Sequence, residues 1–179
     1  MMARDCDSSC PWSSSRCGTP SGTRTRSTSS WSPGNIEASY TLPADAAVPT
    51  VAPFDASDPN SFNHTTSVTI YDSLGASHQA SLFFVKTATP NQWTLHTQID
   101  GVDVGAPQTL SYSSTGTLTA PVGGEITLPA HVTTNGSSPL NVTLDLSASA
   151  QYGEAFSVSR LGQDGYTTGR LSGIEVGDG

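Results

Sequence analysis

The chain has 179 residues, of which 35% are hydrophobic and 7% aromatic, and its formal net charge is −8. Serine, threonine, glycine and proline fill much of the remainder, a composition that favours many short strands and turns over long helices. An acidic chain repels a phosphate backbone, and no apolar run of about 18 residues occurs, so neither nucleic-acid binding nor membrane insertion is expected.

The first 33 residues differ in composition from the rest of the chain. They hold all three cysteines, Cys6, Cys10 and Cys17, and four of the seven basic residues. The cysteine spacing matches no zinc-binding pattern and the segment has no strand or helix period, so we expect a disordered head without a metal site. No apolar stretch follows Arg4, so a secretory signal peptide is not expected. The composition changes abruptly at about Gly34, as a frameshift or a mistaken start would produce.

After the head, the chain becomes acidic and proline-rich. Residues 35–179 contain three basic and 13 acidic residues, which leaves a net charge of −10. Four prolines interrupt residues 34–65: Pro43, Pro49, Pro53 and Pro59. Because proline disfavours helices and central strands, this part is predicted to be an extended lead-in that runs over the surface of the body.

Two apolar runs suited to pairing follow the lead-in. In residues 66–72 apolar and polar side chains alternate, whereas in residues 79–86 apolar side chains occupy both faces. The turn residues between the runs, DSLGASH, predict a hairpin with a longer loop. Because both of its faces are apolar, the second strand is predicted to take a central position in its sheet.

Four more segments complete a predicted β-domain over residues 66–150. They are residues 92–99, which end at an Asp-Gly turn, and residues 108–114, 124–130 and 139–147. The predicted core side chains are Val68, Ile70, Leu82, Phe84, Trp93, Leu95, Val142 and Leu144. We predict a mainly β fold, an antiparallel β-sandwich or a partly open β-barrel. Residues 151–179, with glycines at turn-like places, are interpreted as a connector into an adjoining domain.

Residues able to carry chemistry are scattered along the chain. The four histidines have polar neighbours, and we interpret each as a surface residue: His64, His78, His96 and His131. DGVDVG lacks the alternating acids and closing glutamate of a calcium loop and is better interpreted as a hairpin turn. Asn-x-Ser/Thr triplets begin at Asn63, Asn135 and Asn141, but such triplets arise by chance in a chain rich in serine and threonine. We therefore predict no catalytic, cofactor-binding or metal-binding residue, no cofactor and no enzymatic activity.

Five segments match, in the same order, the sequence pattern of a known family. They are SVTIYDSLGASHQASLFFVKT (67–87), NQWTLHTQIDG (91–101), GNIEASYTLPADAAVP (34–49), FDASDPNSFNH (54–64) and LDLSASAQYGEAFSVSRLGQDGYTTGRLSGIEV (144–176). The first contains a YDSLG turn with a histidine just after it, and the second opens with N-x-W. Together they resemble the central region of the bacterial flagellar hook protein family over nearly all of the chain after the head.

The resemblance implies a structural, non-enzymatic subunit of the flagellar hook, the flexible coupling between basal body and filament. It also implies export by the flagellar secretion channel to the outside of the cell. The implied partners are other hook subunits and flagellar axial proteins. The terminal helical regions of the family have no counterpart in this sequence, so a fragment truncated at both ends is expected, and this fragment is expected to be monomeric by itself.

Two other interpretations are compatible with the sequence. A secreted carbohydrate- or cell-binding β-module would show an exposed row of aromatic side chains, whereas Trp93 alternates with core-type residues. A related distal-rod or hook-scaffold axial protein would differ from a hook protein mainly in length and termini.

Overall fold

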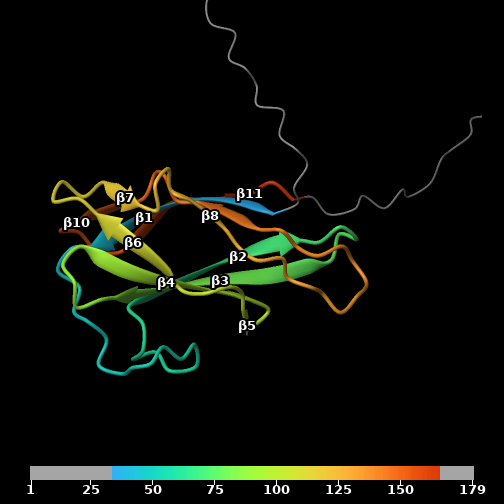
Figure 1. Ribbon diagram of the computed structural model, residues 1–179, viewed down its shortest axis with the longest axis horizontal. Helices are drawn as coiled ribbons and strands as arrows, with labels where there is room; N and C mark the ends of the chain where they lie inside the picture. Colours follow the sequence, from blue (N-terminus) through green and yellow to red (C-terminus); the bar gives the residue numbers. More distant parts are fainter. Residues whose placement is uncertain (1–33, 166–179) are drawn as a thin grey trace, which may run out of the picture. The chain divides into compact units, whose positions relative to one another are not determined.

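The computed structural model describes residues 34–165 (Figure 1). These residues form eleven β-strands, which confirms the mainly β fold class. Within this range no helix is long and apolar enough to cross a membrane. The strands form two sheets, called sheet A and sheet B below, that enclose a common hydrophobic core.

Sheet B has six strands in the order β2-β3-β4-β6-β7, with β5 paired to β4. Its strands are β2 (His64–Tyr71), β3 (Ser77–Lys86), β4 (Gln92–Ile99), β5 (Val102–Asp103), β6 (Gln108–Tyr112) and β7 (Leu118–Ala120). All of its pairs are antiparallel. The predicted hairpin is confirmed as β2 and β3, and β3 lies between β2 and β4, as its two apolar faces indicate.

Sheet A has five strands: β1 (Asn35–Pro43), β8 (Glu125–Thr127), β9 (Thr143–Asp145), β10 (Ala150–Tyr152) and β11 (Ser157–Gln163). Its middle strand is β1. One edge of β1 pairs antiparallel with β11, while β9 and β10 pair parallel with successive parts of the other edge. These parallel pairs join segments that are distant in sequence, and the local sequence pattern did not predict them.

The lead-in differs from its expected position on the surface. Its first part is β1, and the alternate side chains of this strand are buried: Ile36, Ala38, Tyr40 and Leu42. The prolines do not prevent this arrangement, because the first of them, Pro43, is the last residue of the strand. Within the lead-in, Gly34 and residues 44–63 lack a strand. Part of the predicted connector also belongs to sheet A, because β11 pairs along β1.

The hydrophobic core lies between the facing sides of the two sheets. Seven of the predicted core residues are buried, and the eighth, Val68, is partly buried and packs against them. Sheet B curls toward sheet A at its β6–β7 end (Figure 1). There the backbone N–H of Gln151 donates to the carbonyl oxygen of Gly116 at 2.9 Å, and Thr117 forms an isolated bridge with Ala150. The two sheets are thus linked by backbone hydrogen bonds as well as by the core.

Segment 44–63 covers part of the outer face of sheet B. The rings of Phe54 and Phe62 lie 5.2 and 5.1 Å from the ring of Phe83 on β3. Phe54 also stacks on His96 of β4, with 4.0 Å between ring centroids. Segment 44–63, which contains no strand or helix, therefore shields the outward side chain of Phe83 from water.

Candidate functional site

The candidate site is a polar cluster at one end of the core. The inward side chains of β3 run Phe84, Leu82 and Ala80, and the next one in this alternating series is His78. His78 pairs with Ile70 of β2, so both side chains lie on the inner face of sheet B. The inner-face series therefore changes from apolar to polar at His78.

Asp72, directly after β2, is the buried anion of the cluster. Its side chain is fully buried. One carboxylate oxygen, Oδ1, accepts hydrogen bonds from the backbone N–H groups of Leu74 and Ala76 at 2.9 and 2.8 Å. The other, Oδ2, accepts a hydrogen bond from the Asn135 amide and lies 3.3 Å from Nε2 of His78. The short side chain of aspartate suits this role, because it can bind backbone N–H groups a few residues further on and so close the β2–β3 turn.

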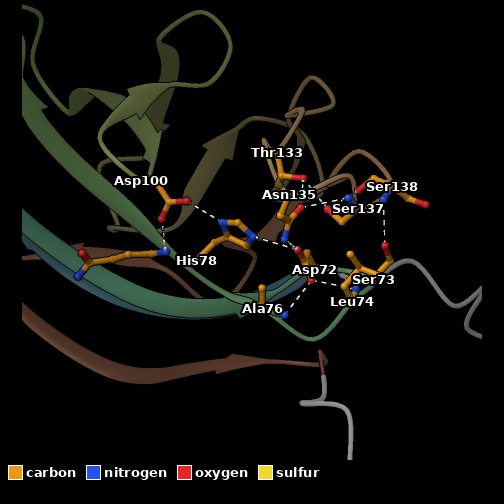
Figure 2. A network of polar contacts seen from close by, with 11 residues as sticks. Asp72, Ser73, Leu74, Ala76, His78, Asp100, Thr133, Asn135, Ser137 and Ser138 are labelled. Atoms are coloured by element: carbon orange, nitrogen blue, oxygen red, sulfur yellow. Dashed lines mark hydrogen bonds and ion pairs between the residues drawn. The ribbon is translucent and has the colours of Figure 1, made fainter.

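Asp100 approaches the histidine from the opposite side. It lies in the two-residue β4–β5 turn, where Asp100 and Gly101 have φ angles of 51° and 79°, so the Asp-Gly hairpin turn is confirmed. Its Oδ1 accepts a hydrogen bond from the backbone N–H of Gln79 at 2.8 Å. Its Oδ2 lies 2.6 Å from Nδ1 of His78. Figure 2 shows the imidazole ring between the two carboxylates.

The third part of the cluster is the tip segment, residues 133–138, in the connection between β8 and β9. This connection continues the β8–β9 pairing, because His131 and Leu140 exchange backbone hydrogen bonds of 2.9 and 2.8 Å. In the tip segment Asn135 binds Asp72, and the backbone N–H of Ser138 donates to Oγ of Ser73 at 2.9 Å. The cluster thus connects a loop of sheet A to a turn of sheet B (Figure 2).

The electrostatics of the cluster favour its charged forms. The hydrogen bond with Asp100 raises the pKa of His78, burial lowers it less, and Asp72 raises it further. The Asn135 amide is the main cause that holds the pKa of Asp72 well below its usual range, assisted by the N–H groups of the turn and by His78, whereas desolvation opposes this. Desolvation raises the pKa of Asp100, but the hydrogen bonds from His78 and Gln79 together bring it below its ordinary value.

His64 and His96 do not belong to the cluster around His78. His64 stacks on Phe156 at 4.4 Å and His96 on Phe54 at 4.0 Å, and burial lowers the pKa of both. Within residues 34–165, no group of three or more His, Cys, Asp or Glu side chains could hold a metal ion. The three cysteines lie outside the described residues. The predicted absence of catalytic, cofactor and metal residues therefore stays a prediction.

The interpretation of His78 as a surface histidine is wrong, because its side chain is only 12% exposed and lies on the inner face of sheet B, at one end of the hydrophobic core. A signal for its position was present in the sequence. The alternating series of β3, extended back from Phe84 by steps of two, reaches His78. No such signal exists for Asn135, because its contact with Asp72 joins residues 63 positions apart.

A family model described as "Flagellar basal body protein FlaE D2 domain" matches residues 41–166, which include the whole polar cluster. The chain belongs to the FlaE D2 domain family. This confirms the resemblance to the hook protein family described above. The matched range begins at residue 41, inside β1, whereas this strand begins at Asn35. The folded part of the chain therefore starts before the matched range.

Two curated relatives of this D2 family member are flagellar hook proteins. The flagellar hook protein FlgE of Escherichia coli is 35% identical over 136 residues, which are 73% of this chain and 33% of that protein. That of Salmonella typhimurium is 32% identical over 136 residues, which are 72% of this chain and 32% of the relative. The chain thus spans about a third of the length of these hook proteins.

A solved structure is also similar. It is a 32 kDa fragment of the flagellar hook protein FlgE from Caulobacter crescentus, with 14% identity and a TM-score of 0.47. The similarity covers 57% of this chain and 46% of that fragment.

Proposed function

We propose that the chain is a structural, non-enzymatic subunit, or a part of one, of the bacterial flagellar hook. The observation that carries this proposal is the D2 family match over residues 41–166, together with 35% identity to the hook protein of Escherichia coli. In this role the β-domain belongs to the flexible coupling between basal body and filament in flagellum-dependent motility. Its partners are other hook subunits and flagellar axial proteins, without nucleic acid and without membrane insertion.

The described surface supports a structural role rather than sugar binding. A carbohydrate-binding module needs exposed aromatic side chains on which sugar rings stack. Trp93 is fully buried, and among the exposed large hydrophobic side chains of the described residues Tyr152 is the one aromatic. The aromatic rings on the outer face of sheet B pack against each other. The alternative of a sugar- or cell-binding module therefore finds no support in residues 34–165.

We further propose the organisation expected from the sequence: a head over residues 1–33, a lead-in over 34–65, the β-domain over 66–150 and a connector over 151–179. In the structure, β1 of the lead-in and β11 of the connector pair within sheet A. The division therefore marks sequence segments of one β-structure more than independent folding units. The proposed location is the hook outside the cell, reached through the flagellar secretion channel.

Immunogold labelling of isolated hook–basal-body complexes tests the proposed function. Antibodies against the purified chain should label the curved hook in preparations from the organism that encodes it. Adsorption of the antibodies with the purified chain should remove the label. Gold on the rod alone would support the related axial protein instead, and complexes that carry no gold while the cell envelope is labelled would contradict a role in the flagellum.

A further inference from the structure

The geometry around His78 fixes the form of its imidazole ring. Both ring nitrogens face carboxylate oxygens, Nδ1 at 2.6 Å from Asp100 and Nε2 at 3.3 Å from Asp72. An ionised carboxylate only accepts hydrogen bonds, and a neutral imidazole donates from one nitrogen only. Both contacts are therefore hydrogen bonds only when the ring carries two protons and a positive charge.

The charged groups around His78 also favour the doubly protonated, positively charged ring. The charged groups that face His78 are Asp72 from the β2–β3 turn and Asp100 from the β4–β5 turn. The tip segment contributes the neutral amide of Asn135, and His131, before the tip, interacts electrostatically with Asp100. The two basic side chains of residues 34–165 lie elsewhere, with Lys86 over the Trp93 ring and Arg160 paired with Glu37. The imidazolium is thus the cation between the two carboxylates.

Loss of one proton changes the two contacts unequally. The shorter contact, with Asp100, keeps the remaining proton on Nδ1, and Nε2 then presents a lone pair to the Asp72 carboxylate. Asp72 is fully buried, and a buried carboxylate without its cation is unfavourable. The same carboxylate holds the Asn135 amide, so the disturbance at Nε2 reaches the tip segment directly.

We propose that His78 is a protonation-dependent latch, which as an imidazolium holds the β2–β3 turn, the β4–β5 turn and the tip segment together and on deprotonation loosens the tip segment. The latch joins a loop of sheet A to turns of sheet B at the end of the core, so its release opens this end without unpairing a strand. The latch rests on the contacts of Asp72, His78, Asp100 and Asn135 and holds whether or not the chain belongs to a hook.

The pH range in which the latch acts follows from the signs of the pKa changes. The pKa of His78 is raised above its ordinary value of 6.5, so its stabilisation is fully present below 6.5 and is lost as the pH rises through the folded-state value. The pKa values of Asp72 and Asp100 are lowered from 3.8, so their stabilisation is present above 3.8 and is lost as the pH falls through their folded-state values. The latch is therefore closed in mildly acidic solution and opens on the alkaline side.

The test follows the imidazole nitrogens and the backbone amides of the full chain by NMR between about pH 5 and pH 9, a range that spans the titration of histidine. We expect both nitrogens of His78 to be protonated at pH 6.5 and the amide of Ser138 to lose protection from exchange as His78 titrates. Each pKa unit of His78 above its ordinary value corresponds to about a tenfold change in the opening equilibrium. A neutral His78 at pH 6, or protection of Ser138 that is unchanged through the titration, would overturn the latch.

Three variants locate the effect. His78→Gln removes the titrating charge and should abolish the pH dependence of Ser138 protection. The matched control His96→Gln, on the outer face of sheet B, should retain it. Asp100→Asn keeps the shape of the turn while removing a carboxylate, so it should move the midpoint of the transition to lower pH, and it tests the proposal even if His78→Gln does not fold. An unchanged pH dependence in His78→Gln, its loss in His96→Gln, or an unmoved midpoint in Asp100→Asn would each contradict the proposal.

Discussion

At the scale of single residues, Leu144 shows how much of the core depends on one side chain. It is fully buried on β9, where it pairs with Ile36 of β1 and Ile126 of β8. Leu144→Ala should lower the free energy of unfolding by about 2–5 kcal/mol, because truncation loses apolar burial and leaves a cavity. Urea unfolding monitored by far-ultraviolet circular dichroism measures this loss.

Val122 provides the matched control for this truncation, because its side chain is 93% exposed. Val122→Ala should change the free energy of unfolding by no more than about 0.5 kcal/mol. A loss below about 1 kcal/mol for Leu144→Ala would mean that the facing sides of the two sheets are not packed as described.

At the scale of elements, the β6–β7 turn depends on a close approach between the two sheets. Gly116 has a φ of 84°, and a Cβ atom there would lie 2.2 Å from the carbonyl oxygen of Gln151. Gly123, in the β7–β8 turn, has a similar φ of 82° but open space around it. Gly123→Ala should therefore cost only the left-handed backbone strain, about 1–2 kcal/mol.

Gly116→Ala should cost about 1–3 kcal/mol more than Gly123→Ala, because the added methyl group also forces the turn away from β10. Thermal unfolding of the two variants side by side measures the difference. Equal midpoints would show that the turn moves freely relative to sheet A and that the backbone bond between Gly116 and Gln151 contributes nothing.

At the scale of the whole molecule, charge governs how copies of the chain meet. Residues 35–179 carry a net charge of −10. In the described part, Lys86 is 7% exposed and Arg160 is paired with Glu37 at 2.7 Å, so the exposed surface offers acids with little to balance them. Mutual repulsion over about 10 Å at 0.1 M salt should keep the chain monomeric at micromolar concentration.

Sedimentation velocity measures this directly, with one species near 18.5 kDa as the expected result. A salt series is the control, because screening shortens the repulsion without changing the fold. Growth of the sedimentation coefficient with concentration at low salt would show a contact strong enough to overcome the charge and would contradict the predicted monomer.

Local sequence pattern was sufficient for most of sheet B. In residues 92–99 Trp93 and Leu95 recur with period 2, and both are buried on β4. The Asp-Gly turn after this strand is equally local, because its conformation depends on two adjacent residues that tolerate positive φ. Such features can be read from the sequence because they arise within a few consecutive residues.

The position of β1 and the membership of the polar cluster could not be read in this way. Apolar and polar side chains alternate in residues 36–42, which is compatible with a strand, but the prolines of the lead-in favoured an extended run over the surface instead. What made β1 central was parallel pairing with β9 and β10, which lie far along the chain. Asn135 likewise became a partner of Asp72 only because the connection between β8 and β9 reaches the β2–β3 turn.

The sequence by itself therefore determined the β class of the chain, the hairpin of β2 and β3, the buried faces of β2, β3 and β4, and the family. The tertiary structure alone decided which strand lies in the middle of sheet A and which segments meet at the polar cluster around His78. The physical reason is the range of the interactions: side-chain alternation and turn conformation act between neighbours, whereas sheet order and charge pairing depend on segments that meet only after folding.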